Sequence, residues 1–141
     1  MLPNRGMENK NSITLAKENS QKNKEKCKKI QSISPRIRYV GMINDFGRTV
    51  AGQLRSGVVP LFNRDQALND HFIEAMRTNL RKGLYPAVGK VNYSYTEHEK
   101  VKMLTIPTEW GHYSVTLDKE TDYTEIKSIL DEVLKLVASM Q

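Results

Sequence analysis

The fold of this chain is decided by a stretch that reads Ile37-Arg38-Tyr39-Val40-Gly41-Met42-Ile43-Asn44-Asp45-Phe46-Gly47-Arg48-Thr49-Val50-Ala51-Gly52-Gln53-Leu54. Its first seven residues are rich in β-branched and aromatic side chains, which favours a strand. The next four are turn residues, because Asn and Asp tolerate left-handed backbone and Gly adopts positive φ freely. The remainder returns as a second strand. Apolar side chains lie on both faces of the first strand, so we expect a hairpin that is covered on both sides.

Two glycines lie inside these strands, Gly41 and Gly52. A glycine within a strand often marks a position where a neighbouring element approaches closely. We therefore expect a packed element, such as a helix, to lie over this part of the hairpin.

The longest regular pattern predicts a central helix from about Arg64 to Tyr85. Its apolar residues repeat at intervals of three and four, which places them on one continuous face. The stripe consists of Leu68, Phe72, Ala75, Met76, Leu80 and Leu84, with Ile73 beside it. A stripe this regular has to pack on the sheet or on a second copy of the helix. Pro86 and Gly89 are expected to end the helix.

Three further strands and a final helix follow. The strands are expected at 91–96, 101–106 and 110–117, and the short links between them predict an antiparallel meander. The final helix spans about 123–139, with Asp122 as its N-cap and Glu125 as the capping-box partner. The element order lacks βαβ alternation. It indicates an α+β fold with one five-stranded antiparallel sheet and helices segregated by face.

The N-terminal part of the chain carries most of the charge. Residues 1–35 hold eight basic and three acidic side chains, a balance of +5 within a whole-chain charge of +6. Residues 1–17 are expected to form a disordered basic arm, because they offer few apolar groups to offset the entropy of ordering. Met7 is an alternative start to Met1.

A marginal helix is expected at 18–32. Cys27, Ile30 and Ile33 recur at a spacing of three and give it a thin apolar edge, so the helix needs docking to persist. Pro35 ends it. The predicted domain therefore spans residues 18–140, with its sheet and remaining helices after about residue 36.

Composition narrows the classes of protein to consider. A chain of 141 residues lies within the usual single-domain range. It has one cysteine, so no intrachain disulfide can form and the fold has to depend on its apolar core. No apolar run approaches the roughly 18 residues of a membrane span, and the N-terminus has no apolar stretch of signal-peptide length. We expect a cytoplasmic protein without membrane association.

The element order and the first hairpin resemble the roadblock/dynein-light-chain domain, which belongs with the profilin-like folds. The resemblance covers most of residues 20–140, and the strand that ends in Asp45-Phe46-Gly47 and returns into small residues is typical of that family. One departure is the link from Arg55 to Asn63, which carries Pro60 and is longer than roadblock domains often have. The resemblance implies a dimeric scaffold or regulator of small GTPases, and it assigns that role to no individual residue.

At closer range, four runs resemble a family of small archaeal proteins of unknown function. These runs are Ile37-Arg38-Tyr39-Val40-Gly41, Pro60-Leu61-Phe62, Glu99-Lys100-Val101-Lys102 and Thr105-Ile106-Pro107. The closer resemblance implies no activity.

No catalytic, cofactor-binding or metal-binding group is expected. His71, His98 and His112 lack the spacing of a zinc site, and ordinary surface or edge positions explain them more simply. Cys27 is a candidate reactive thiol because neighbouring lysines favour the thiolate, although packing against the domain is the preferred interpretation. The run Arg55-Ser56-Gly57 has the residue types for an anion contact but not the pattern.

The leading hypothesis is a non-enzymatic, homodimeric module for protein–protein interaction or regulatory scaffolding. It rests on the element order and on apolar helix surface in excess of what one sheet buries. The candidate interface is formed by Phe72, Ile73, Met76 and Leu80.

Two alternatives stay open. One is a small-molecule sensing domain of PAS- or GAF-like shape, for which an apolar cavity beneath the central helix would be the discriminating feature. The other is weak, salt-sensitive nucleic-acid binding through the basic arm, which has no aromatic residues on which bases could stack.

Overall fold

The computed structural model describes residues 5–141, with side chains from residue 12 onward. Its elements are α1 (Arg5–Gln31), β1 (Ile37–Asn44), β2 (Thr49–Leu54), α2 (Arg64–Arg81), a 3-10 turn η1 (Lys82–Leu84), α3 (Tyr85–Val88), β3 (Ser94–Glu97), β4 (Val101–Pro107), β5 (Gly111–Asp118) and α4 (Tyr123–Ser139). The five strands form one antiparallel sheet in the order β2-β1-β5-β4-β3. The predicted α+β class and the predicted meander of the last three strands are confirmed.

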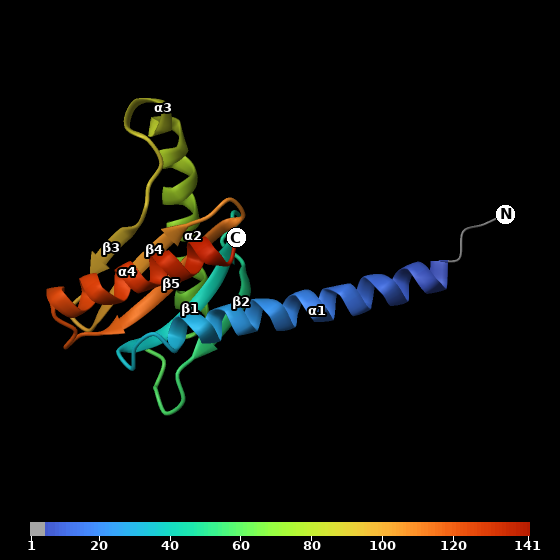
Figure 1. Ribbon diagram of the computed structural model, residues 1–141, viewed down its shortest axis with the longest axis horizontal. Helices are drawn as coiled ribbons and strands as arrows, with labels where there is room; N and C mark the ends of the chain where they lie inside the picture. Colours follow the sequence, from blue (N-terminus) through green and yellow to red (C-terminus); the bar gives the residue numbers. More distant parts are fainter. Residues whose placement is uncertain (1–4) are drawn as a thin grey trace.

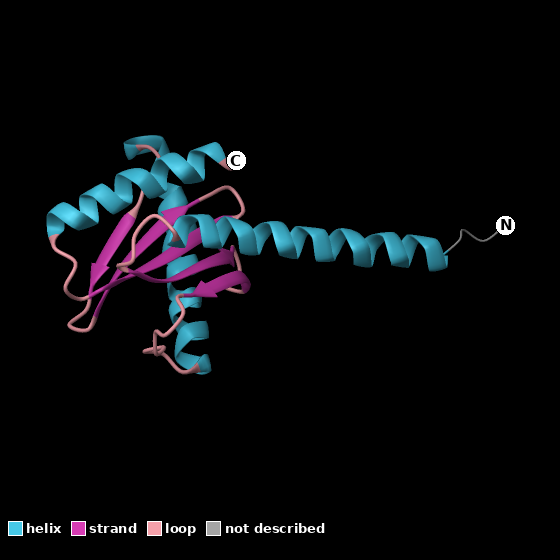
Figure 2. Ribbon diagram, turned by 60° about the horizontal axis from the view of Figure 1, so that its bottom comes forward, coloured by secondary structure: helices cyan, strands magenta, loops and turns pink. Residues whose placement is uncertain are grey.

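Helices cover both faces of the sheet. Figure 1 and Figure 2 show α1 and α4 on one face and α2 crossing the other. The main core lies beneath α1 and α4, where side chains of all the longer strands meet those of the two helices. Its buried residues include Cys27, Ile30, Val40, Met42, Leu104, Ile106, Tyr113, Val115, Leu117, Ile126, Ile129, Leu130, Val133 and Val137. Alternate residues of the same strands face α2.

The predicted hairpin forms as expected. The side-chain oxygen of Asn44 accepts hydrogen bonds from the backbone N–H groups of Phe46 and Arg48, both at 3.0 Å. Gly47 adopts a φ of +82°, the left-handed backbone that the turn requires. With α1 on one face and α2 on the other, the expectation of two-sided cover is also met.

The glycines of the hairpin have a different neighbour from the one expected. Gly41 and Gly52 pair across β1 and β2, and the ring of Tyr39 lies over both. A Cβ atom would lie 2.8 Å from the Tyr39 hydroxyl at Gly41 and 2.6 Å from it at Gly52. The suggestion of a helix above them is therefore wrong. The helix α2 comes closest at Gly47, where a Cβ would lie 2.7 Å from the Cα of Phe72.

Helix α2 starts with a capping box that the sequence analysis overlooked. Asn63 accepts a hydrogen bond from the Gln66 backbone N–H at 2.8 Å, and the Gln66 side chain accepts one from the Asn63 N–H at 3.0 Å. The helical path continues past the predicted end, through η1 and α3. Pro86 does not stop it, because it lies in the first turn of α3, where its missing N–H is not needed.

Strand β3 is shorter than predicted. The expected strand began at Val91, whereas pairing with β4 begins at Ser94, opposite Thr105. Extending this register by two residues would bring Asn92 opposite Pro107, which has no N–H to donate. Tyr93 consequently lies outside the sheet and is half exposed.

Helix α1 is longer than predicted. It begins at Arg5 instead of residue 18, so the described part of the expected disordered arm is helical, and residues 1–4 lie outside the described part. Its last turns dock on the domain through Cys27 and Ile30, which are fully buried, and through a 3.1 Å hydrogen bond from Gln31 to the Gln53 carbonyl. The side chains of residues 12–22 are exposed. Figure 1 shows this part of α1 projecting beyond the rest of the molecule.

Deletion of residues 1–15 should leave the thermal midpoint of unfolding nearly unchanged, because the docked contacts of α1 begin much later in the helix. The control is Ile30→Ala, which removes a fully buried side chain and should cost roughly 2–5 kcal/mol. Thermal unfolding followed by circular dichroism compares the two. A loss of many degrees on deletion would show that the projecting part belongs to the folded unit.

Candidate interaction surface

Helix α2 rests on the sheet through a face made of small and polar residues. His71, Ala75 and Thr78 are its buried residues. The Nδ1 atom of His71 lies 2.9 Å from the Thr49 hydroxyl, in hydrogen-bond contact. The His71 ring also stacks on that of Tyr39, with centroids 6.4 Å apart and planes inclined by 13°. The sheet-facing side of α2 is therefore a layer of paired polar groups and small side chains.

The predicted apolar stripe lies mostly on the opposite side of the helix. We call this surface the outer face of α2. It consists of Leu68, Phe72, Ile73, Met76 and Leu80, whose side chains are between 42% and 71% exposed. Of the predicted stripe, Ala75 alone is buried. Most of the predicted stripe therefore does not pack on its own sheet.

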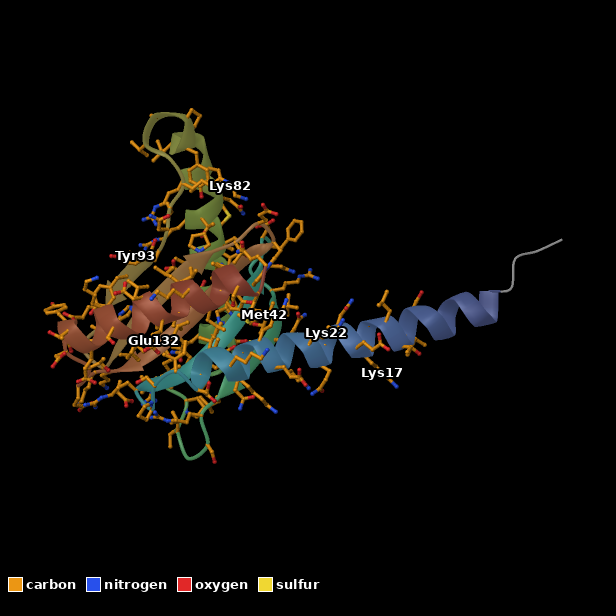
Figure 3. All side chains as sticks on the ribbon, viewed as in Figure 1. Lys17, Lys22, Met42, Lys82, Tyr93 and Glu132 are labelled. Atoms are coloured by element: carbon orange, nitrogen blue, oxygen red, sulfur yellow. The ribbon has the colours of Figure 1, made fainter. Side chains whose placement is uncertain are left out.

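Other apolar side chains extend the exposed surface. Beyond the end of α2, they are Leu84, Val88 and Tyr93. Tyr93 is labelled in Figure 3, in the segment that returns from α3 to the sheet. Phe46, at the tip of the first hairpin, is 80% exposed. Exposed apolar surface on this scale is characteristic of a binding surface.

A cavity of about 210 Å³ lies between the sheet and the first half of α2. The strands contribute Tyr39, Leu54, Val101, Met103, Ser114 and Thr116, the helix contributes Ala67, Asp70 and His71, and the remaining walls are Arg38, Pro60, Leu61 and Phe62. The last three belong to the long link that departs from the roadblock pattern. This cavity was not predicted from the sequence; the available signal was the apolar run Pro60-Leu61-Phe62 in the link.

Two titratable groups at the cavity are shifted by burial. Desolvation raises the pKa of Asp70 and the neighbouring Glu74 carboxyl raises it further, while His98 and Arg77 partly oppose the rise. Desolvation lowers the pKa of His71. Both groups are therefore biased toward their neutral forms.

The histidines are more deeply buried than expected. His98 is exposed, but His71 and His112 are buried, so the prediction of surface or edge positions is wrong for these two. Neither ring nitrogen of His112 has a hydrogen-bond partner among the described residues. Desolvation, together with the charge of His71, lowers the pKa of His112 to about 4.

The remaining sequence candidates do not come together. Cys27 is fully buried, and desolvation raises the pKa of its thiol to about 11, which favours the packing interpretation over a reactive thiolate. Arg55 forms an ion pair with Asp118 at 3.5 Å, so its guanidinium is already engaged. Among the side chains of residues 12–141, no three His, Cys, Asp or Glu are grouped to hold a metal ion. No described helix combines the length and hydropathy needed to cross a membrane.

The fold is that of roadblock/LC7 proteins of known structure. Myxococcus xanthus MglB matches with a TM-score of 0.65 and 10% identity, over 87% of this chain and 90% of that one. A roadblock/LC7 domain from Streptomyces avermitilis matches with a TM-score of 0.60 and 11% identity, over 83% of this chain and 95% of that one. An MglB with a tetrameric arrangement matches with a TM-score of 0.66 and 11% identity, over 84% of this chain and 87% of that one. No protein-family model matches the chain, and no curated protein matches it in sequence. The predicted resemblance is confirmed at the level of fold.

The buried thiol of Cys27 should not react with a thiol reagent in the native protein. Its burial and raised pKa leave the thiolate too rare and too inaccessible, so labelling should follow the opening of the fold. The control is Ser20→Cys in a Cys27→Ser background, which places a thiol on the exposed part of the same helix. Equal labelling rates for the two thiols would contradict the burial of Cys27.

Acid should destabilise the fold through His112. Its folded pKa of about 4 lies below the ordinary histidine value of 6.5, so between these pH values the unfolded chain binds a proton that the folded chain does not. Stability therefore falls as pH is lowered through this window, by roughly 3 kcal/mol near its lower end. Urea unfolding at several pH values should show a flatter dependence for His112→Gln than for the unsubstituted protein. His98→Gln, at an exposed site, should keep the full dependence, and equal slopes for the two variants would contradict this assignment.

Proposed function

We propose that this protein is a homodimeric, non-enzymatic interaction module with a regulatory or scaffolding role, and that the outer face of α2 forms the dimer contact. The observation that carries the proposal is the orientation of α2. The helix packs on the sheet through its small and polar residues, and five apolar side chains remain exposed on its other side.

A two-fold contact suits this surface. In a two-fold dimer the same patch serves both copies, so one apolar helix face can cover its own counterpart. The 18 residues of α2 span about 27 Å, which gives the two helices several turns of mutual contact. Met76 and Ile73 lie near the middle of the face, where side chains of a partner would be fully desolvated. Residues at such central positions dominate interface energetics.

The role of the dimer is inferred from the roadblock resemblance. That resemblance implies a scaffold or regulator of small GTPases, and we include such a partner in the proposal as a class only. The cytoplasmic location in the proposal comes from the composition of the chain. The similar MglB with a tetrameric arrangement supports assembly between copies as a property of this fold.

The projecting part of α1 supports nucleic-acid binding less well. Figure 3 shows Lys17 and Lys22 on this helix, away from the other elements. Their charges offer weak, salt-sensitive attraction to polyanions, but no described aromatic residue lies beside them for base stacking. Specific recognition therefore does not form part of the proposal.

Substitutions on the outer face should dissociate the dimer and leave a folded monomer. Phe72→Ala removes a half-exposed ring, so we expect little loss of stability within the protomer and roughly 30-fold weaker dimerisation, the effect of losing about 2 kcal/mol. Met76→Glu should weaken dimerisation further, because it places a carboxylate in the desolvated centre. Sedimentation equilibrium measures the association directly. Urea unfolding at several protein concentrations should depend on concentration only for the dimeric forms.

The matched control is Ile13→Glu, which puts the same charge at an exposed apolar residue of α1. It should leave dimerisation unchanged. A strict monomer at tens of micromolar for the unsubstituted protein would end the proposal. So would a Met76→Glu variant that dimerises as strongly as Ile13→Glu.

A further inference from the structure

The cavity beneath α2 lies on the opposite side of the helix from the proposed dimer contact. Its helix wall is Ala67, Asp70 and His71, whereas the outer face lies on the other side of the same turns. Binding inside it is therefore a separate property from dimerisation. It is also the feature that a small-molecule site in this type of fold requires.

The size and walls of the cavity limit what it can hold. Most of its lining is apolar, with Leu54, Leu61, Phe62, Val101 and Met103 around the space. An apolar cavity of about 150 Å³ stays dry and binds benzene, so about 210 Å³ accommodates one ring with a short substituent. Drug-sized ligands occupy larger pockets, of roughly 300–1,000 Å³.

One charged group at the cavity, the Asp70 carboxyl, lacks a direct partner among the described residues. The Arg38 guanidinium is engaged: it donates to the Val59 carbonyl at 2.8 Å and contacts Asp118 at 3.4 Å. The Nδ1 atom of His71 is in hydrogen-bond contact with the Thr49 hydroxyl. The Asp70 carboxyl, in contrast, has no hydrogen bond or ion pair with any residue that the structure describes. It is half-buried, and Glu74 lies one turn further along the helix. Arg77 and His98 lie near enough to lower its pKa, but neither forms an ion pair with it.

An unpaired carboxyl next to apolar walls favours one class of ligand. A carboxylate loses hydration when a ligand closes the cavity, and only a cation or a strong donor compensates that loss. An anionic ligand would add repulsion instead. The charge of the site is thus complementary to an ammonium group, and its walls are complementary to a ring.

We propose that this cavity binds a small hydrophobic amine, with its ring between the sheet and the Leu61-Phe62 segment and its ammonium group against Asp70. The link from Arg55 to Asn63 then has a function as the outer wall of the site. The chain would combine a dimer surface and a ligand site on two sides of one helix.

The test uses three probes of equal ring and chain length with the full-length protein near neutral pH. Phenethylamine should bind, phenethyl alcohol should bind at least tenfold more weakly, and phenylacetate should bind more weakly still. Amide proton–nitrogen correlation spectra report affinity and location together. The largest shifts should occur in the segments 58–62, 67–71 and 101–103.

Two variants separate charge from shape. Asp70→Asn should reduce the affinity for phenethylamine to that for phenethyl alcohol. Ala67→Leu, which fills the cavity from the helix side, should abolish binding of both. Ala138→Leu, the same change at an exposed position of α4, should leave binding unchanged.

Several results would overturn the proposal. These are equal binding of phenylacetate and phenethylamine, unchanged amine affinity in Asp70→Asn, or largest shifts at residues that do not line the cavity. Absence of binding by all three probes would overturn it as well. The dimer proposal is tested separately, by sedimentation equilibrium of Met76→Glu.

Discussion

The contact between α2 and the sheet orients the rest of the functional surface. Helix α2 approaches closely enough for its backbone at Phe72 to touch Gly47, and Ala75 is the small residue buried between helix and strands. Larger side chains on that side of the helix would hold it away from the sheet. Because the small side faces inward, the large apolar side chains of the helix face outward. The exposed surface and the cavity are both consequences of this one contact.

The layer beneath α2 differs in chemistry from the core under α1 and α4. The core under α1 and α4 is an apolar cluster of aliphatic side chains with one tyrosine and one cysteine. The layer beneath α2 contains two buried histidines, and the hydroxyl of Thr49 forms a hydrogen bond with one of them, His71. A core of the first kind supplies most of the stability. The polar layer supplies less, and its histidines have to stay neutral to remain buried. Natural proteins tolerate such departures from an ideal core mainly where function requires them.

Much of the fold could be predicted because local rules and tertiary structure agree. Asn44 to Gly47 forms the predicted turn, and Asp122 caps α4 at the predicted place by accepting a hydrogen bond from the Glu125 N–H. The Glu125 side chain, expected from the sequence to complete a capping box, pairs with Arg36 instead. Two predictions failed for different reasons. Strand β3 is shortened by a register that places Pro107, from another strand, opposite Asn92 in the predicted strand. The glycines of the hairpin accommodate a ring from the same hairpin instead of a helix.

The sequence by itself determined the order of the strands and the longer helices, and which residues share a face of each helix. Periodicity carries that information because 3.6 residues make a turn. It did not determine which face of α2 points inward, since an apolar stripe is equally compatible with a core and with a partner. Only the tertiary structure decided this, through the small residues that allow close approach. It alone also formed the cavity, because Tyr39, Phe62, Asp70 and Met103 come from four segments that no local pattern relates.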